Sequence, residues 1–321
     1  MEEIQVIELR MMDKRKYYPL TLASGLCIRS MLYPFMLIKT RLQIQRGNTV
    51  YKGTFDAFLK ISRGEGASGL YRGFWVSCLQ LFPSMSYITS YEWARHHLTQ
   101  EMDVTNTRQV SFAAGGLASI VGQTLAVPLD IVTQHLMLMG RRTEGGEARA
   151  QRKLASLQTV RVSEQARHSR FGAVQAVVET IYRQSGVLGF YKGYFVSLMC
   201  FAPNSALWWF FYDIYSDSLT VVSPDWVPRL LLRTVAAPLS GVSAAVITNP
   251  LDVIRARIQV EGQTWKETVE TLWEEEGYWI LTKGLSARLV QSVTFSFFII
   301  LGYETIKRWS LLDRYKDKVR W

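Results

Sequence analysis

Long apolar segments that are nearly free of charge alternate with short polar segments along the chain. Six such segments, each of 18 to 22 residues, span 17–38, 74–91, 109–129, 193–212, 234–251 and 284–303. That length matches the roughly 20 residues that an α-helix needs to cross the hydrocarbon core of a membrane. Gly, Ser, Thr and Pro punctuate the segments, and small residues let membrane helices approach closely. The pattern therefore predicts six transmembrane helices, with six buried helices of a soluble protein as the alternative.

A stretch with a proline, an acid and two bases closes the fifth segment. Residues 249–257 read Asn-Pro-Leu-Asp-Val-Ile-Arg-Ala-Arg, and weaker copies occur at 34–41 and 128–135. Asp252 and Arg255 are three residues apart, so they share one face of a helix. Pro250 has no N–H to donate, so a kink is expected there. The three copies indicate an internal repeat.

Each copy is followed by a short amphipathic segment and a second apolar segment, so each unit reads as helix, short surface helix, helix. The predicted organisation is a polar N-terminal tail (1–15), units at 16–100, 107–219 and 228–312, and a C-terminal tail (313–321). The middle unit is the longest because residues 140–170 carry eight bases and three acids, which predicts a solvated loop.

Composition and candidate chemistry change this picture little. The formal net charge is +10, but no basic stretch is interleaved with aromatics on a binding module, so we expect basic membrane-protein loops and no nucleic-acid partner. Cys27, Cys78 and Cys200 lie in apolar segments and are predicted to be packing residues. The four histidines lack ligand spacing, and no nucleophile or phosphate-loop motif occurs, so no metal, cofactor or enzyme is expected. Residues 1–16 lack a signal-peptide core, so targeting information is expected to be internal.

The repeat resembles the signature of the mitochondrial carrier family over nearly the whole chain. That signature is Pro-x-acid-x-x-base-x-base, then acid-Gly, then aromatic-base-Gly, three times. Here its later parts include Glu65-Gly66 and Glu276-Gly277. The resemblance implies an all-α membrane protein whose six transmembrane helices form three pseudo-symmetric repeats around a central cavity, with short matrix-side amphipathic helices. It implies a multi-pass monomer that moves small solutes across the inner mitochondrial membrane by alternating access.

The resemblance also implies a matrix gate made of ion pairs between units. Its predicted members are the pairs Asp130–Arg255 and Asp252–Lys39, with the glutamine braces Gln43 and Gln259. Both partners of the third pair are missing, since Met36 and Thr133 stand there. A joint loss fits a partnership, because a lone buried acid would be costly.

A second, cytoplasmic gate is implied at the ends of the even-numbered helices. Its predicted members are Glu92, Arg95, Asp213, Glu304 and Lys307. Arg95 would pair with Asp213, and Lys307 with Glu92, while Glu304 faces Ser216 instead of a base. Ordinary exposed ion pairs, worth under about 1 kcal/mol each, are the alternative.

Two aromatic-base-Gly motifs resemble the cardiolipin sites of the family, where helix N-termini meet lipid phosphates. The predicted lipid-binding residues are Tyr71, Arg72, Gly73, Tyr191, Lys192 and Gly193. The third motif, Thr282-Lys283-Gly284, lacks the aromatic residue.

Arg29 lies near the middle of the first apolar segment. A charge there costs roughly 2.5–3.5 kcal/mol on insertion, so it should face a wet cavity or a partner. Residues 29, 36 and 43 share a heptad-like stripe beside the gate, and Gln123 is the equivalent of Arg29 in the second unit. The resemblance places further cavity contacts at Gln80, Ser84, Cys200, Phe201, Asn204, Arg288 and Gln291. Satisfied polar groups between helices are the alternative.

Two candidate bases and no acid between the gates suit a small monocarboxylate or an amino acid better than a nucleotide or a polycation. Arg29 would hold the carboxylate by charge-assisted bonds, and Asn204 or Gln80 would receive the ammonium. An aliphatic side chain would lie against Phe201, Trp208 and Trp209. Residues 203–209 resemble the family members that carry branched-chain amino acids, which implies leucine, isoleucine and valine as substrates. Another neutral amino acid or small carboxylate, or a non-transporting membrane adaptor, remains the alternative.

Overall fold

The computed structural model describes residues 11–47, 49–100, 107–139, 160, 170–224 and 226–312. Almost all of them are helical, and their one β-type pairing is a single antiparallel bridge between Met12 and Leu311. The long helices are α1 (Lys14–Ile44), α4 (Leu81–Gln100), α5 (Thr107–Leu138), α9 (Tyr194–Val222), α10 (Arg229–Glu261) and α12 (Leu285–Ser310). The short ones are α2 (Thr54–Gly64), η2 (Ala67–Tyr71), α3 (Phe74–Cys78), α8 (Arg170–Ser185), η3 (Val187–Tyr191), α11 (Trp265–Glu276) and η4 (Gly277–Leu281).

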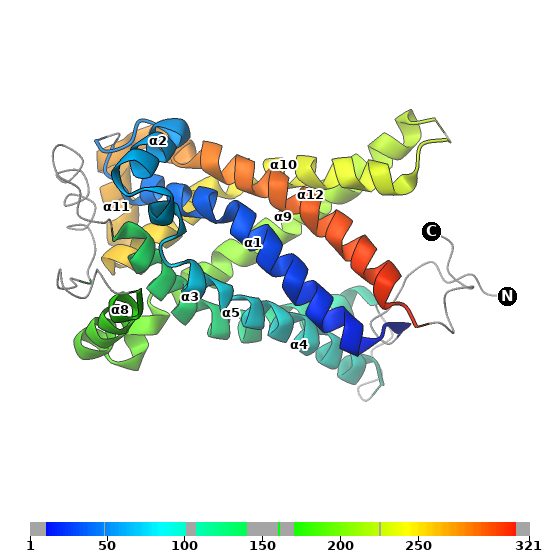
Figure 1. Ribbon diagram of the computed structural model, residues 1–321. Helices are drawn as coiled ribbons and strands as arrows, with labels where there is room; N and C mark the ends of the chain where they lie inside the picture. The colour runs from blue at the N-terminus through cyan, green and yellow to red at the C-terminus, as the bar shows by residue number, and fades with distance from the viewer. Residues whose placement is uncertain are drawn as a thin grey trace.

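The long helices run between two ends of the molecule (Figure 1). The short helices α2, α8 and α11 gather at one end, and the start of α1 and the end of α12, the described ends of the chain, lie at the other. In the described part of the chain, three helices are long and apolar enough to cross a membrane. They are Lys14–Ile44, Ala113–Leu138 and Leu231–Glu261, whose mean hydropathies are 1.4, 1.4 and 1.5.

The first long helix continues past its motif proline. α1 includes Pro34 and ends at Ile44, and α5 and α10 likewise pass through Pro128 and Pro250. A proline inside a helix removes one hydrogen bond, which neighbouring helices and side chains in a membrane protein can replace. The proline of each motif therefore lies inside a continuous helix.

The second apolar segment forms two helices rather than the single helix predicted. α3 ends at Cys78 and α4 begins at Leu81, so Gln80 lies in the turn between them. Pro83 has no N–H with which to close an α-helical bond to the carbonyl of Leu79. That carbonyl instead accepts from the N–H of Phe82 at 3.1 Å, and Gln80 N–H donates to the Ser77 carbonyl at 3.0 Å. The turn is thus tightened to i→i+3 bonds.

The glycine of each aromatic-base-Gly motif comes directly before a helix. Gly73, Gly193 and Gly284 have φ angles of 81°, 73° and 67°, a left-handed conformation that glycine adopts without strain. A Cβ atom on Gly284 would lie 2.9 Å from the Cγ atom of Gln43. Glycine therefore lets the start of α12 pack directly against the end of α1.

The largest buried clusters lie at the end of the molecule that carries the short helices. One joins the last turns of α1 to Ala57 and Ile61 of α2, and the other joins α5 to Val177 of α8. Buried residues of α1 are concentrated between Leu32 and Ile44. Packing therefore closes this end, while many large apolar side chains of the described residues stay exposed, among them Trp209 and Phe210 of α9.

Two buried arginines join the ends of neighbouring helices. Arg41 pairs with Glu65, both with 1% exposed side chains, and its Nε atom donates to the Met137 carbonyl at the end of α5 at 2.8 Å. Arg257 of α10 donates through Nη2 to the Gln45 carbonyl at the end of α1 at 3.1 Å. Helix-end carbonyls lack partners within their own helix, so these bonds satisfy them.

We predict that Glu65→Leu lowers the free energy of unfolding by about 3–5 kcal/mol, because it leaves the buried guanidinium of Arg41 without its counter-charge. Thermal unfolding of the purified protein in lipid nanodiscs measures this change. The double variant Arg41→Met/Glu65→Leu should recover part of the loss. The exposed pair Lys266–Glu270 is the control, and Lys266→Ala should leave the unfolding midpoint unchanged. Equal shifts for Glu65→Leu and Lys266→Ala would contradict the prediction.

Candidate functional site

A polar cavity of about 220 Å³ lies among α1, α5, α10, α12 and the turn between α3 and α4. Its lining includes all four predicted ion-pair residues of the matrix gate, namely Lys39, Asp130, Asp252 and Arg255. The candidate cavity residues Gln80 and Gln291 also line it. The structure therefore brings charges that are far apart in the sequence around one small space.

Both predicted matrix pairs have ion-pair geometry. Lys39 Nζ lies 2.6 Å from Asp252 Oδ2, and Arg255 Nη2 lies 2.5 Å from Asp130 Oδ2. Each of these side chains is 15–22% exposed, so the pairs are largely shielded from solvent. Shielding strengthens their attraction relative to a surface pair. The two pairs link α1 to α10 and α5 to α10.

The two glutamines that were predicted as braces behave differently. Gln43 donates through Nε2 to Asp252 Oδ2 at 2.9 Å, as a brace of that pair would. Among the described residues, Gln259 reaches the other pair only through Ser197. The hydroxyl of Ser197 accepts from Arg255 Nε at 3.1 Å and from Gln259 Nε2 at 3.0 Å. The bracing of Arg255 is thus indirect.

The position of the missing third pair is neutral. Met36 and Thr133 both line the cavity, and the Thr133 hydroxyl donates to the Leu129 carbonyl of its own helix at 2.7 Å. No charge-assisted bond therefore joins α1 to α5 at this level in the part of the chain that the structure describes. We call the Lys39–Asp252 and Asp130–Arg255 pairs, together with the neutral position at Met36 and Thr133, the ion-pair ring. Two of its three sides therefore carry an ion pair.

Arg29 has a partner rather than an open position in the cavity. Its Nη1 atom donates to Gln80 Oε1 at 2.7 Å and to the Ser77 carbonyl at 2.5 Å. Gln80 Nε2 in turn donates to Asp130 Oδ1 at 2.7 Å. One amide side chain therefore connects Arg29 to an acid of the ion-pair ring.

Arg288 is more deeply enclosed than Arg29. Its Nη2 atom donates to Thr248 Oγ1 at 2.7 Å and to Asn204 Oδ1 at 3.2 Å, and its Nε atom lies 3.8 Å from Asp252 Oδ2. Thr248 also donates to Asn204 Oδ1, at 3.0 Å. The carbonyl oxygen of Asn204 is thus already engaged, which weakens its case as the acceptor for a substrate ammonium.

The remaining cavity candidates fall into two groups. Ser84 and Cys200 donate to the backbone carbonyls of Gln80 and Leu251, so their polar atoms are used within the protein. Gln123 and Gln291 each have a buried Oε1 atom without a hydrogen-bond partner. Gln291 lines the cavity, as does Gln134, whose Oε1 atom also lacks a partner, whereas Gln123 is not part of the lining.

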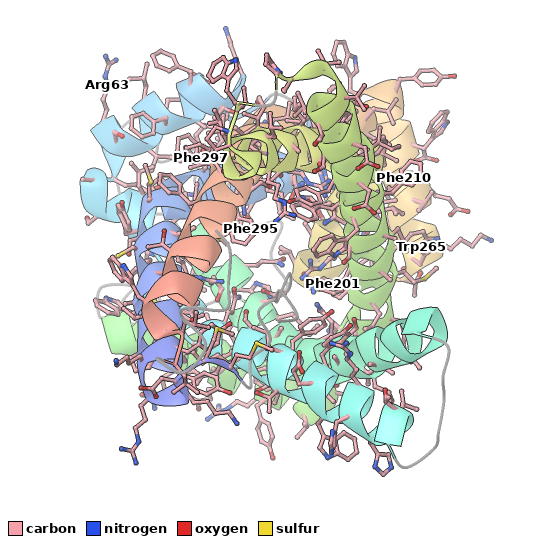
Figure 2. The ribbon with its side chains drawn as sticks, turned by 90° about the vertical axis from the view of Figure 1, so that its right-hand side faces the viewer. Arg63, Phe201, Phe210, Trp265, Phe295 and Phe297 are labelled. Carbon is pink, nitrogen blue, oxygen red and sulfur yellow. The ribbon has the colours of Figure 1, made fainter. Side chains whose placement is uncertain are left out.

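Phe201 is a partly exposed aromatic residue of α9. Its ring lies 6.2 Å from that of Tyr87, centroid to centroid, which connects α9 to α4. Figure 2 looks along the molecule from the end that carries the termini and shows Phe201 and Phe295 on the inner sides of α9 and α12. Phe210 lies on the outer side of α9. Phe295 was not anticipated from the sequence.

The predicted cytoplasmic gate is not formed among the residues that the structure describes. Glu92, Arg95 and Asp213 are all exposed, and no ion pair joins Arg95 to Asp213. The side chains of Glu304 and Lys307 lie outside the described residues. The Arg95–Asp213 pair is therefore not formed, whereas the two ion pairs at the opposite end are formed.

The three aromatic-base-Gly motifs also differ from one another. Tyr71 is 42% exposed and donates to the Ser30 carbonyl at 3.1 Å, and Tyr191 and Lys192 are partly exposed. Lys283 is instead buried against the carboxylate of Glu276. Burial lowers the pKa of Lys283 to about 8, because a desolvated ammonium is disfavoured. The base of the third motif is thus occupied by a protein partner.

Three residues of the network were not anticipated from the sequence. They are Ser197, Thr248 and Gln134, and the last donates to Gln259 Oε1 at 2.5 Å. Ser197 follows Gly193 by one helical turn, and Thr248 directly precedes the Asn249-Pro250 pair. Position within the repeat could have indicated them, but a hydroxyl in a helix more often bonds to its own backbone.

A family model described as "Mitochondrial carrier protein" matches residues 16–102, 105–222 and 228–313. The chain belongs to the mitochondrial carrier family. Solute carrier family 25 member 44 of Homo sapiens is 40% identical over 325 residues, which cover 99% of this chain and 98% of that relative. The same protein of Mus musculus is 40% identical over 99% and 98%.

A more distant relative is mitochondrial substrate carrier family protein H of Dictyostelium discoideum, 26% identical over 93% of this chain and 91% of that relative. The resemblance to the family that the repeat indicated is thus confirmed. Mitochondrial carriers are transporters of the inner mitochondrial membrane, so this chain is a carrier that moves a small molecule.

We predict that restoring the third ion pair slows transport by this carrier. The double variant Met36→Asp/Thr133→Lys adds a pair between α1 and α5, which must be broken whenever the closed end opens. Because an ion pair of this kind contributes on the order of 1 kcal/mol or more, uptake into proteoliposomes should slow roughly fivefold or more. Each single variant is a control that should lower thermal stability, because it buries an unpaired charge. An unchanged uptake rate in the double variant would show that the vacancy does not ease opening.

Proposed function

We propose that this carrier moves a neutral amino acid, first of all leucine, isoleucine or valine, across the inner mitochondrial membrane by alternating access. The observation that carries the proposal is the position of Arg29 at the border of the polar cavity, next to the ion-pair ring. A single accessible guanidinium can bind one carboxylate by charge-assisted bonds. A small amino acid has one carboxylate, one ammonium and one side chain to place.

The arrangement of charge supports a monocarboxylate over larger anions. Arg288 is buried and held by Thr248, Asn204 and Asp252, although its Nη1 atom has no partner. Arg29 is partly exposed, so it is the base better placed to exchange its Gln80 partner for a ligand. A nucleotide would need several such bases. The buried Oε1 atom of Gln291, which lacks a partner and lines the cavity, is the acceptor that we assign to the substrate ammonium. This assignment replaces Asn204.

The apolar surfaces support an aliphatic side chain. Phe201 is 36% exposed and Phe295 is 47% exposed, and both lie on the inner sides of their helices (Figure 2). An aliphatic group between two aromatic faces buries apolar surface on both sides, which favours leucine-sized substrates over smaller ones. The resemblance of residues 203–209 to branched-chain amino acid carriers supports the same choice.

In an alternating-access cycle, the structure would correspond to the state that is closed on one side of the membrane. We take the closed end, with its two ion pairs, as the matrix side and the end that carries the termini as the cytoplasmic side. In this state the substrate would enter from the cytoplasm and reach the ion-pair ring. The proposal includes six membrane spans, formed by the long helices, and lipid phosphates at the starts of α3 and α9.

We predict that Arg29→Ala abolishes saturable uptake of labelled leucine into proteoliposomes, because the substrate carboxylate loses its counter-charge in a shielded site. Arg63→Ala is the matched control, since Arg63 is an exposed arginine on α2 outside the cavity (Figure 2), and it should transport normally. Thermal unfolding of both variants checks that the fold is intact. Valine and isoleucine should compete with leucine.

Each result has a distinct meaning. Normal uptake by a folded Arg29→Ala protein would remove Arg29 from the site. Uptake of leucine that valine does not compete would point to another neutral amino acid. Folded native protein that takes up neither neutral amino acids nor small carboxylates would favour a non-transporting membrane adaptor.

A further inference from the structure

Gln80 occupies an unusual place between the proposed substrate arginine and the ion-pair ring. Arginine has only donors and an ionised carboxylate has only acceptors, so the orientation of the Gln80 amide is determined by its two neighbours. Its Oε1 atom accepts from Arg29 at 2.7 Å, and its Nε2 atom donates to Asp130 at 2.7 Å. The amide therefore gives a directional connection from Arg29 to the Asp130–Arg255 pair.

The backbone at Gln80 is also a weak point of its helix. Gln80 lies in the turn between α3 and α4, where i→i+3 bonds replace the α-helical ladder. Such turns have poorer hydrogen-bond geometry, and within a longer helix they often mark a hinge. Arg29 also donates to the Ser77 carbonyl that caps this turn, at 2.5 Å. Arg29 thus holds both the side chain of Gln80 and the turn that carries it.

The equivalent positions in the other two units lack this arrangement. Cys200 and Gln291 follow their motif glycines by the same seven residues, but they lie inside the continuous helices α9 and α12. Cys200 donates to the Leu251 carbonyl, and Gln291 has a free Oε1 atom. In the described residues, neither joins a cavity arginine to an acid of the ring.

We propose that Gln80 couples the occupancy of Arg29 to the Asp130–Arg255 ion pair. The inference rests on the proposed function, because it takes Arg29 as the residue that binds the substrate carboxylate. When no substrate is bound, Arg29 orients Gln80, and Gln80 holds Asp130 in position to pair with Arg255. A carboxylate that captures the Arg29 Nη1–H removes the donor to Gln80 Oε1.

The released amide no longer orients Asp130, so the ion pair with Arg255 loses one supporting bond. The closed end then opens more readily when substrate is present than when the cavity is empty. Gln80 acts here through Asp130 and Arg29, so it is a positioning residue.

Hydrogen exchange of the backbone amides in residues 131–138 of α5 tests the coupling, because these amides exchange when the closed end opens. Full-length protein in nanodiscs is compared with and without saturating leucine. In the native chain, leucine should accelerate this exchange about tenfold, because that factor corresponds to the loss of roughly one charge-assisted hydrogen bond. Gln80→Leu should exchange fast without leucine and respond to it less than about twofold.

Two further variants separate coupling from a general loss of packing. Thr40→Val removes a polar group that lines the same cavity but donates only to the Met36 carbonyl of its own helix, so it should keep slow exchange without leucine. Gln80→Glu keeps an acceptor for Arg29 but sets a carboxylate against Asp130, so its exchange should also be fast without leucine. The apparent KM of Gln80→Leu for leucine uptake should stay within about threefold of the native value, because Arg29 remains.

The inference would be overturned if Gln80→Leu exchanged these amides at the native rate without leucine and showed the same acceleration as the native chain when leucine is added. The same would follow if Thr40→Val and Gln80→Leu behaved alike. Failure of the native chain to take up leucine would overturn the proposed function instead. The leucine-free comparison of the Gln80 and Thr40 variants would still decide whether Gln80 holds the closed end shut.

Discussion

A charge that leaves water must find a partner, and the closed end of this carrier depends on that constraint. Lys39 and Arg255 pair with acids from neighbouring helices, and Arg41 pairs with Glu65 in an almost fully buried position. Removing one member of such a pair leaves an uncompensated charge, which costs far more than the pair contributes. The pairs therefore specify which helix ends meet, and packing of the short helices then covers them.

The same constraint bears on the proposed opening of the closed end. Ion pairs that line a polar cavity can exchange one polar partner for another, whereas a packed apolar contact has no such alternative. Here the ring of pairs has a neutral side at Met36 and Thr133, so fewer bonds must separate together. The deeper Arg41–Glu65 pair lies outside the cavity lining and connects α1 to the short segment that follows it. We infer that it moves with its own unit.

The three units are alike in pattern but not in local structure. The second apolar segment of the first unit is interrupted at Gln80, between α3 and α4. The corresponding helix of the second unit, α9, is continuous, although its Pro203 occupies the position equivalent to Pro83. The two units also differ in the residue beside this turn, since Arg29 donates to the Ser77 carbonyl in the first unit and its counterpart in the second unit is the neutral Gln123. The repeated units thus share one sequence pattern and differ at a few residues near the cavity.

The sequence by itself determined the helical segments, the repeat and the family. Charge-free segments of membrane length and a proline-acid-base motif in register are local features, and they carry that information without tertiary contacts. The pairs Lys39–Asp252 and Asp130–Arg255 followed from the family resemblance, and their side chains do meet.

The tertiary structure alone decided how the polar groups are shared. The sequence suggested Asn204 as a free acceptor and Gln259 as a direct brace, but Arg288 and Ser197 take up those groups. It also suggested one helix where Gln80 lies in a turn. Hydrogen bonds between helices depend on which side chains the packing brings within about 3 Å, and residue spacing along one helix does not contain that information.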